Sequence, residues 1–161
     1  MSTQCPIETY LRLRPRDNDG SSIEYTLREA ELRDGSTRGL FELSIPPDAA
    51  PGLVHNNTSG KVSYEFDAIF NEEATQEDVF EVIARDKVEN LMNGENSTIF
   101  AYGQTGSGKT YSIFGGDSFQ ERGIIPRTLG AIFHLRQQQI DAGGSKVTLR
   151  LSFTEVYGEV V

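Results

Sequence analysis

The sequence has little cysteine, no long apolar run and a shortage of basic residues. Its single cysteine, Cys5, excludes a disulfide within the chain, which is typical of a reducing compartment. A membrane-spanning helix needs about 20 consecutive apolar residues, and the sequence contains no such run. The first residues, M-S-T-Q-C-P, also lack the basic and apolar regions of a secretion signal. The sequence therefore predicts a cytosolic protein without a membrane span.

The charge balance narrows the classes of partner. There are 15 Lys and Arg residues against 24 Asp and Glu residues, which gives a formal net charge of −9. Nucleic acids are bound by clustered positive charge, so no nucleic-acid partner is expected for these residues. The length of 161 residues suits one domain, and a hydrophobic content of 37% is sufficient for a core.

The most informative segment is residues 99–116, I-F-A-Y-G-Q-T-G-S-G-K-T-Y-S-I-F-G-G. Within it, residues 103–110 match G-x-x-x-x-G-K-[ST], the pattern of the phosphate-binding loop (P-loop) of nucleotide triphosphatases. An apolar, β-rich run at 98–102 predicts a strand before the loop, and a helix start follows it, which is the order that this motif requires. The predicted phosphate-binding residues are Gly103, Gln104, Thr105, Gly106, Ser107, Gly108, Lys109 and Thr110.

Each residue type in the loop suits a crowded, negatively charged phosphate chain. Gly103, Gly106 and Gly108 let backbone N–H groups approach the phosphates and permit positive φ angles. A helix that begins near Lys109 would direct unpaired N–H groups at the β-phosphate. Lys109 would reach the β- and γ-phosphate oxygens, and the hydroxyl of Thr110 would coordinate Mg²⁺. The loop therefore predicts a nucleotide site with Mg²⁺.

Residues 7–70 carry mostly strand patterns. Alternation at 7–13 predicts a first strand, β-rich runs between turn clusters predict a small antiparallel meander at about 20–61, and residues 62–70 predict a further strand. The first strand ends in an Arg-Pro element with two explanations from local sequence. Arg12 and Arg14 are exposed charges beside a strand-ending Pro15, or all three form a flat surface for an adenine ring.

Two helices and a last strand are predicted in the remainder. Thr75 and Asp78 have the spacing of a capping box and begin a helix at about 75–93, whose apolar face is expected to pack on a sheet. The helix after the P-loop is expected to be split by a loop at 115–125 and to resume near Pro126. Alternation at 146–157 predicts a strand.

Several of these segments share a pattern beyond the P-loop. They are A-Y-G-Q-T-G-S-G-K-T-Y from Ala101, R-G-I-I-P-R at 122–127 and F-T-E-V-Y-G-E at 153–159, with L-R-L-R-P-R at 11–16, F-D-A-I-F at 66–70 and T-Q-E-D-V-F at 75–80. In order and spacing they resemble the kinesin motor domain along most of the chain. Another phosphate-loop protein, such as a small kinase, fits the eight-residue motif but not the Arg-Pro and Tyr-x-Glu elements.

The resemblance implies an α/β fold, that of a P-loop NTPase of kinesin type. Its central mixed β-sheet would be flanked by helices and incomplete at the C-terminal end, because residues 1–161 would be the N-terminal half of the motor domain. It implies ATP or ADP with Mg²⁺ as the bound nucleotide. It also implies that the adenine lies against Arg12, Arg14, Pro15 and Tyr111, the last being the residue directly after the P-loop.

The resemblance further implies a microtubule-stimulated ATPase that moves along microtubules, with Lys109 and Thr110 as catalytic residues. The location would be the cytoplasm and its microtubule cytoskeleton, and the sequence is also similar to the kinesins of cilia and flagella. The family's two switch motifs, N-x-x-S-S-R-S-H and D-x-x-G-S-E, do not occur in these 161 residues. Most microtubule-binding segments, and a coiled coil that would make the parent protein dimeric, would lie beyond Val161.

The missing switch motifs leave an alternative open. The chain would then be a truncated, non-catalytic kinesin-like fragment that binds nucleotide at most. The P-loop supplies binding and only part of phosphoryl transfer, because the attacking water must also be positioned. We therefore expect no ATP turnover from residues 1–161 alone.

Overall fold

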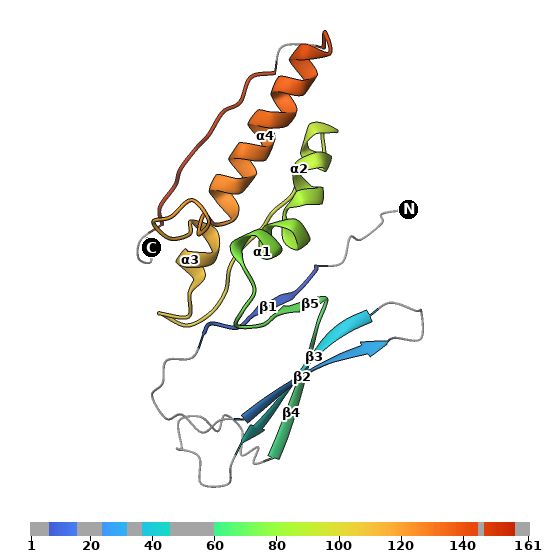
Figure 1. Cartoon of the computed structure of the whole chain (residues 1–161), viewed down its shortest axis with the longest axis vertical. Coiled ribbons are helices and arrows are strands. Elements are labelled where there is room, and N and C mark those ends of the chain that lie inside the picture. The colour runs from blue at the N-terminus through green and yellow to red at the C-terminus, as the bar shows by residue number, and fades with distance from the viewer. Residues whose placement is uncertain (1–6, 16–23, 32–36, 46–59, 145–146, 157–161) are drawn as a thin grey trace, which may run out of the picture.

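The computed structural model describes residues 7–15, 24–31, 37–45, 60–144 and 147–156 (Figure 1). The strands in these ranges are β1 Tyr10–Arg12, β2 Glu24–Glu31, β3 Thr37–Ile45, β4 Gly60–Phe66 and β5 Ala68–Phe70, and the helices are α1 Gln76–Ile83, α2 Arg85–Met92, α3 Lys109–Ile113 and α4 Ile124–Asp141. Figure 1 shows the helices at one end, β2, β3 and β4 at the other, and the β1–β5 pair between them.

The three strands β2, β3 and β4 form an antiparallel sheet in that order. Cross-strand pairs hold its register: the rings of Tyr25 and Phe41 stack with centroids 5.6 Å apart, and Arg28 lies 3.2 Å from the Glu42 carboxylate. β2 and β3 lie in the part of the chain where a meander is expected, whereas β4 lies mostly beyond it, in the strand predicted at 62–70. Parts of that prediction, residues 20–23, 32–36 and 46–59, lie outside the described residues.

The prediction of one strand at 62–70 is wrong, because this segment forms two strands that belong to two different sheets. β4 belongs to the antiparallel sheet, whereas β5 pairs in parallel with β1. The break falls at Asp67, whose Oδ2 accepts the N–H of Thr9 at 2.7 Å and whose Oδ1 lies 3.4 Å from Nη2 of Arg38. The carboxylate thereby ties the start of β1 to the antiparallel sheet. The change of sheet could not be predicted from the sequence, because Asp67 lies inside a run that has the pattern of a single strand.

The helix predicted at 75–93 is also divided. The Thr75 hydroxyl accepts the N–H of Asp78 at 3.1 Å and the Asp78 carboxylate accepts the N–H of Thr75 at 2.8 Å, so the capping box is formed. α1 ends at Ile83, Ala84 follows with φ −116° and ψ −23°, and α2 begins at Arg85. Backbone bonds continue through this bend, since the N–H of Val88 still reaches the Ala84 carbonyl at 3.0 Å.

The hydrophobic core joins β5 to three helices. Its buried members come from β5, α1, α2 and α4 and from the bend between α1 and α2: Phe70, Val79, Phe80, Ala84, Val88, Ile124 and Ile132. The apolar face of α1 and α2 therefore packs on α4 as well as on β5, whereas a sheet alone was expected. Leu91, near the end of α2, is exposed.

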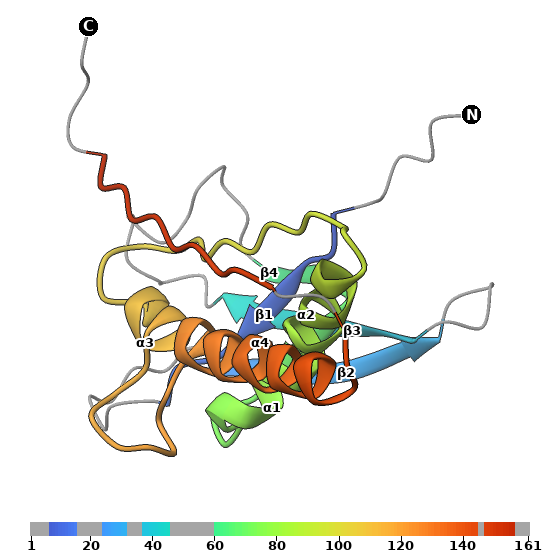
Figure 2. The same cartoon turned by 90° about the horizontal axis from the view of Figure 1, so that it is seen from above.

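Two predicted strands are not formed by the described residues. Residues 98–102 lead into the P-loop without a strand, and residues 147–156 run back along α4 without one (Figures 1 and 2). A strand needs a neighbour for its N–H and C=O groups, and neither segment belongs to a described sheet. The apolar run at 98–102 and the alternation at 146–157 were therefore wrong indicators of strands, and Tyr102 is 95% and Phe153 79% exposed. Arg136 Nε instead donates to the Val147 carbonyl at 2.9 Å.

The central sheet is correspondingly small. Among the described residues it consists of the parallel β1–β5 pair, which lies against α1. In the same part of the chain, no helix has both the length and the apolar character that crossing a bilayer requires.

Candidate phosphate-binding site

Residues 103–108 form a tight loop that leads into α3. Gly106 and Gly108 have φ angles of 80° and 99°, and Gly108 is the N-cap of α3 in the left-handed conformation. A residue with a Cβ atom adopts these angles only with strain, so the motif's glycines are needed for this path. The N–H of Ser107 donates to the Gln104 carbonyl at 3.2 Å and closes the turn.

Lys109 is the first residue of α3 and bends back over the loop. Its Nζ donates to the carbonyl oxygens of Gly103 at 2.9 Å and Gln104 at 2.7 Å. Thr110 follows in the same helical turn and is exposed. The ammonium of Lys109 therefore lies against the loop, and Thr110 follows Lys109 in the first turn of α3.

The helix after the loop is short and stops where an interruption is expected. α3 has five residues, and the loop after it is closed by a β-bridge between Gly115 and Arg122 before α4 begins at Ile124. The N–H of Gly123 donates to the Phe114 carbonyl at 3.1 Å and links the two helices. Five peptide units sum to a small dipole, so the ammonium and the loop amides supply most of the attraction for an anion.

The structure brings Arg12 and Tyr111 together, although they lie far apart in the sequence. Arg12 Nη1 donates to Gln76 Oε1 at 2.9 Å and to Ser112 Oγ at 3.0 Å, and its guanidinium carbon lies 5.3 Å from the centroid of the Tyr111 ring. Burial lowers the pKa of Arg12, but an arginine keeps its charge under such a shift. The cation therefore lies beside the ring.

The end of the first strand also reaches the loop. Arg14 Nη1 donates to the carbonyl of Gly106 at 2.8 Å, a contact that spans 92 residues of sequence. Arg14 and Pro15 are exposed, and Tyr111 is 41% exposed. Arg14 thus contacts the loop, Arg12 lies beside Tyr111 in the helix that follows the loop, and Pro15 follows Arg14 just beyond β1.

Sequence reasoning gave no role to Gln76 and Ser112, which hold this arrangement. Gln76 is 3% exposed, accepts from Arg12 and donates through Nε2 to the Tyr111 carbonyl at 2.7 Å. A signal for it exists: Gln76 lies three and four positions before the buried Val79 and Phe80, so it is a polar residue on an apolar helix face. Such a side chain needs partners.

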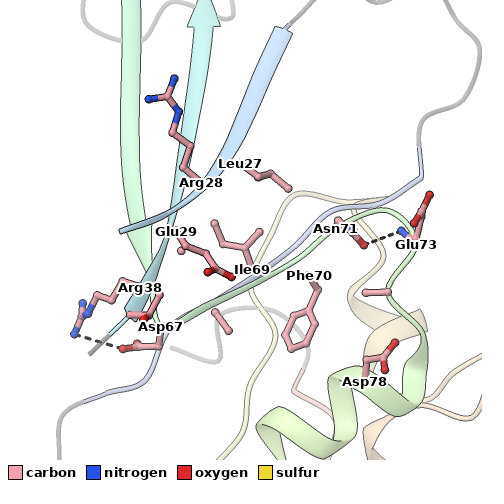
Figure 3. A pocket seen from close by; sticks show the side chains of 14 residues that line it. Leu27, Arg28, Glu29, Arg38, Asp67, Ile69, Phe70, Asn71, Glu73 and Asp78 are labelled. Carbon is pink, nitrogen blue, oxygen red and sulfur yellow. Dashed lines mark hydrogen bonds and ion pairs between the residues drawn. The ribbon is translucent and has the colours of Figure 1, made fainter. Parts of the chain in front are cut away.

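A separate pocket of about 690 Å³ lies between the antiparallel sheet and the start of α1 (Figure 3). Leu27, Ile69 and Phe70 line it, together with the ion pair of Arg38 and Asp67. None of its lining residues belongs to the P-loop or to the Arg-Pro element. It is therefore distinct from the phosphate-binding site.

Comparison with known proteins identifies the family. The sequence model described as kinesin motor domain matches residues 27–161, which is most of the chain. The chain belongs to the kinesin motor-domain family. Human kinesin-like protein KIF15 is 36% identical over 154 residues, covering 89% of this chain and 11% of its own length. Human kinesin-like protein KIF9 is 30% identical over 160 residues, covering 99% of this chain and 19% of its own length.

Solved kinesin structures share the fold. A structure from a study of mutants of the kinesin motor ATPase has a TM-score of 0.63 at 30% identity, covering 84% of this chain and 40% of that one. The motor domain of the Kar3-like kinesin from Ashbya gossypii has a TM-score of 0.60 at 30% identity, covering 84% and 39%. These matches confirm the family and the fold class predicted from the sequence. The chain spans less than a fifth of the length of these two curated kinesins.

Proposed function

We propose that this chain is the ATP-binding part of a kinesin motor that couples ATP hydrolysis to movement along microtubules. One observation carries the proposal: the loop of residues 103–108 leads directly into Lys109, whose ammonium lies against the loop, within a chain that matches the kinesin motor domain over residues 27–161. Membership of this family supports the assignment of the loop as a nucleotide site.

In this proposal, Lys109 is the main residue that binds the phosphates. Its ammonium already lies against the loop, bonded to two neutral carbonyl oxygens. Phosphate oxygens are charged, and charge-assisted hydrogen bonds are stronger than neutral ones. The ammonium therefore exchanges its carbonyl partners for β- and γ-phosphate oxygens and stabilises the charge that develops there.

The proposed Mg²⁺ ligand of the protein is the Thr110 hydroxyl. In the described ranges, no group of three or more His, Cys, Asp or Glu side chains could hold a metal ion. Mg²⁺ keeps several waters and is bound through few protein ligands together with substrate phosphates. The ion would neutralise charge on the phosphates, while Thr110, in the first turn after the loop, would hold it in place.

The proposed base-binding surface consists of Arg12, Arg14, Pro15 and Tyr111. The contact of Arg12 with the ring of Tyr111 and the bond from Arg14 to the loop support it, since both place this surface beside the phosphate site. A flat aromatic ring and a guanidinium both stack on a purine.

The proposed partner and location follow from the family. The partner is the microtubule, bound mainly through segments other than those described, and the location is the microtubule cytoskeleton of the cytoplasm. Cilia or flagella are the finer proposal, which rests on the sequence resemblance. Dimerisation through a coiled coil is also part of the proposal.

The motor function is tested by phosphate release in the longest natural chain that carries residues 1–161. Microtubules should stimulate release by the wild type, and Lys109→Ala should lower the stimulated rate by about 100-fold or more, because one donor to the developing charge is lost. Lys87→Ala is the control, since that ammonium pairs with Glu8 in another part of the fold. An unchanged rate in Lys109→Ala would refute the assignment, and ATP binding without turnover in the wild type would favour a non-catalytic protein.

A further inference from the structure

Gln76 is a buried polar residue that connects two members of the proposed base-binding surface. Its side-chain oxygen accepts from Arg12, 64 residues away, at 2.9 Å. Its side-chain nitrogen donates to the backbone carbonyl of Tyr111, 35 residues away, at 2.7 Å. Both ends of the amide are thus bonded, and the residue is 3% exposed.

The position of Gln76 is fixed from its own side as well. It is the first residue of α1, directly after the N-cap Thr75, whose capping box with Asp78 sets the start of the helix. A buried amide is costly unless its donor and acceptor are both satisfied, so the side chain has little freedom to turn away. Gln76 is therefore a rigid connection between α1 and the first turn of α3.

The two groups bonded to Gln76 are the backbone of Tyr111 and the arginine that lies beside the Tyr111 ring. Arg12 shares its Nη1 between Gln76 and the hydroxyl of Ser112, the residue next to Tyr111, and its guanidinium lies 5.3 Å from the ring centroid. The Tyr111 backbone is bonded directly to Gln76. The ring itself is 41% exposed, so part of it is available to a ligand.

We infer that Gln76 is a positioning residue, which fixes Tyr111 and Arg12 as a base-binding surface without touching the nucleotide. This inference rests on the proposed nucleotide-binding function and deepens it. It separates two contributions to affinity: Gln76 acts on the contact with the purine base, whereas Lys109 acts on the contact with the phosphates. If Gln76 had a merely structural role, its substitution would not weaken the contact with the base selectively.

The test compares two ligands, Mg·ATP and Mg·tripolyphosphate, the second of which has phosphates but no base. Both are titrated calorimetrically into the full 161-residue chain and into Gln76→Met, which keeps the side-chain length and removes both hydrogen bonds. The dissociation constant for ATP should rise about tenfold in Gln76→Met, as expected when an aromatic contact is misplaced, while that for tripolyphosphate should change by less than about twofold. Lys109→Ala should weaken both ligands.

Two further variants keep the test decisive. Gln76→Glu retains an acceptor for Arg12 but places a carboxylate against the Tyr111 carbonyl. It should therefore also weaken the binding of ATP and leave the binding of tripolyphosphate unchanged. This variant replaces Gln76→Met in the test if the methionine variant does not fold. Glu77→Gln, at the next and exposed position of α1, is the matched control and should change neither ligand. Circular dichroism establishes that each variant is folded.

The outcomes separate the inference from the function on which it rests. If the wild type binds both ligands and a folded Gln76 variant weakens both equally, or neither, the inference is overturned and the proposed function stands. If the wild type binds neither ligand, or Lys109→Ala leaves both affinities unchanged, the proposed function fails and the inference fails with it.

Discussion

The contacts of single side chains explain why the loop is prepared for a phosphate. The ammonium of Lys109 is held by two carbonyl oxygens, so little side-chain entropy remains to be lost when phosphate oxygens replace them. Arg14 adds a second cation, bonded to the Gly106 carbonyl. Two cations therefore lie against the loop, in a chain whose formal net charge is −9.

Thr110 is predicted to act through its hydroxyl. Thr110→Ala should raise the Mg²⁺ concentration needed for half-maximal ATP binding by about tenfold, because the protein ligand of the ion is lost. Thr110→Ser keeps the hydroxyl and should restore the wild-type Mg²⁺ requirement. Titrating Mg²⁺ at constant ATP measures this, and an alanine variant with a wild-type requirement would exclude Thr110 as a ligand.

Residue roles could be predicted where a short motif fixes them. The P-loop residues are contiguous, so their chemistry follows from residue type and spacing alone. Gln76 could not be assigned in this way, because its role depends on contacts with Arg12 and Tyr111 across 64 and 35 residues. An isolated polar residue on an apolar face indicates that a partner exists, but not which one.

Helices and strands are connected here by a few close contacts. Asp67 joins β1 to the antiparallel sheet, and Gly123 joins the end of α3 to the start of α4. A Cβ atom at Gly123 would lie 2.7 Å from the carbonyl carbon and oxygen of Ile113, whereas one at Gly130, inside α4, would meet nothing within 4 Å. The two glycines offer a matched pair for testing the junction.

Because of the close contact at the junction between α3 and α4, we predict that a glycine-to-alanine substitution has opposite effects at Gly123 and at Gly130. Gly123→Ala should lower the free energy of unfolding by about 1–3 kcal/mol, because backbone atoms must move to admit the methyl group. Gly130→Ala should raise it by about 0.5–1 kcal/mol, since alanine is the better helix former. Urea unfolding followed by circular dichroism compares them, and equal effects would contradict the close contact.

Asp67 predicts an acid-dependent loss of stability. The hydrogen bond donated by the backbone N–H of Thr9 is the main cause that holds the pKa of the Asp67 carboxyl below its usual value. A lowered folded-state pKa means that the stabilisation is present above the unfolded pKa of about 3.9 and is lost as the pH falls through the folded pKa. Asp67→Asn should therefore lower the free energy of unfolding by about 1 kcal/mol at pH 7.

The same difference between wild type and Asp67→Asn should be smaller at about pH 2 than at pH 7, because the contribution of the carboxylate charge is lost as the pH falls through the folded pKa. Urea unfolding at the two pH values measures it. Asp117→Asn, in an exposed loop, is the control and should have no comparable effect. A difference that is the same at both pH values would show that the charge of Asp67 is not responsible.

At the scale of the whole molecule, the order of the segments was predictable and the assembly of the sheet was not. The capped helix region, the P-loop and the split helix could be predicted because each depends on a pattern of residues that are close together in the sequence. A strand depends on neighbours. Residues 98–102 have the apolar, β-rich composition of a strand and residues 147–156 have the alternation of one, but neither segment pairs with a strand in the described part of the chain. Local pattern therefore predicted the helices better than the sheet.

Family membership and site geometry converge on residues 103–110. The fold brings the Arg-Pro element from one end of the chain and the first turn of α1 beside the loop, and kinesin motor domains match the chain in sequence and fold. The account's central claim is that this loop, through Lys109, binds the phosphates of a nucleotide.

Calorimetric titration of Mg·ATP into the 161-residue chain, with Lys109→Ala and Lys87→Ala beside it, tests that claim most directly. The account predicts equal affinity for the wild type and Lys87→Ala, and affinity at least roughly tenfold weaker for Lys109→Ala, because a charge-assisted contact to phosphate is lost. Undiminished affinity in a folded Lys109→Ala variant, or no binding by the wild type, would contradict it.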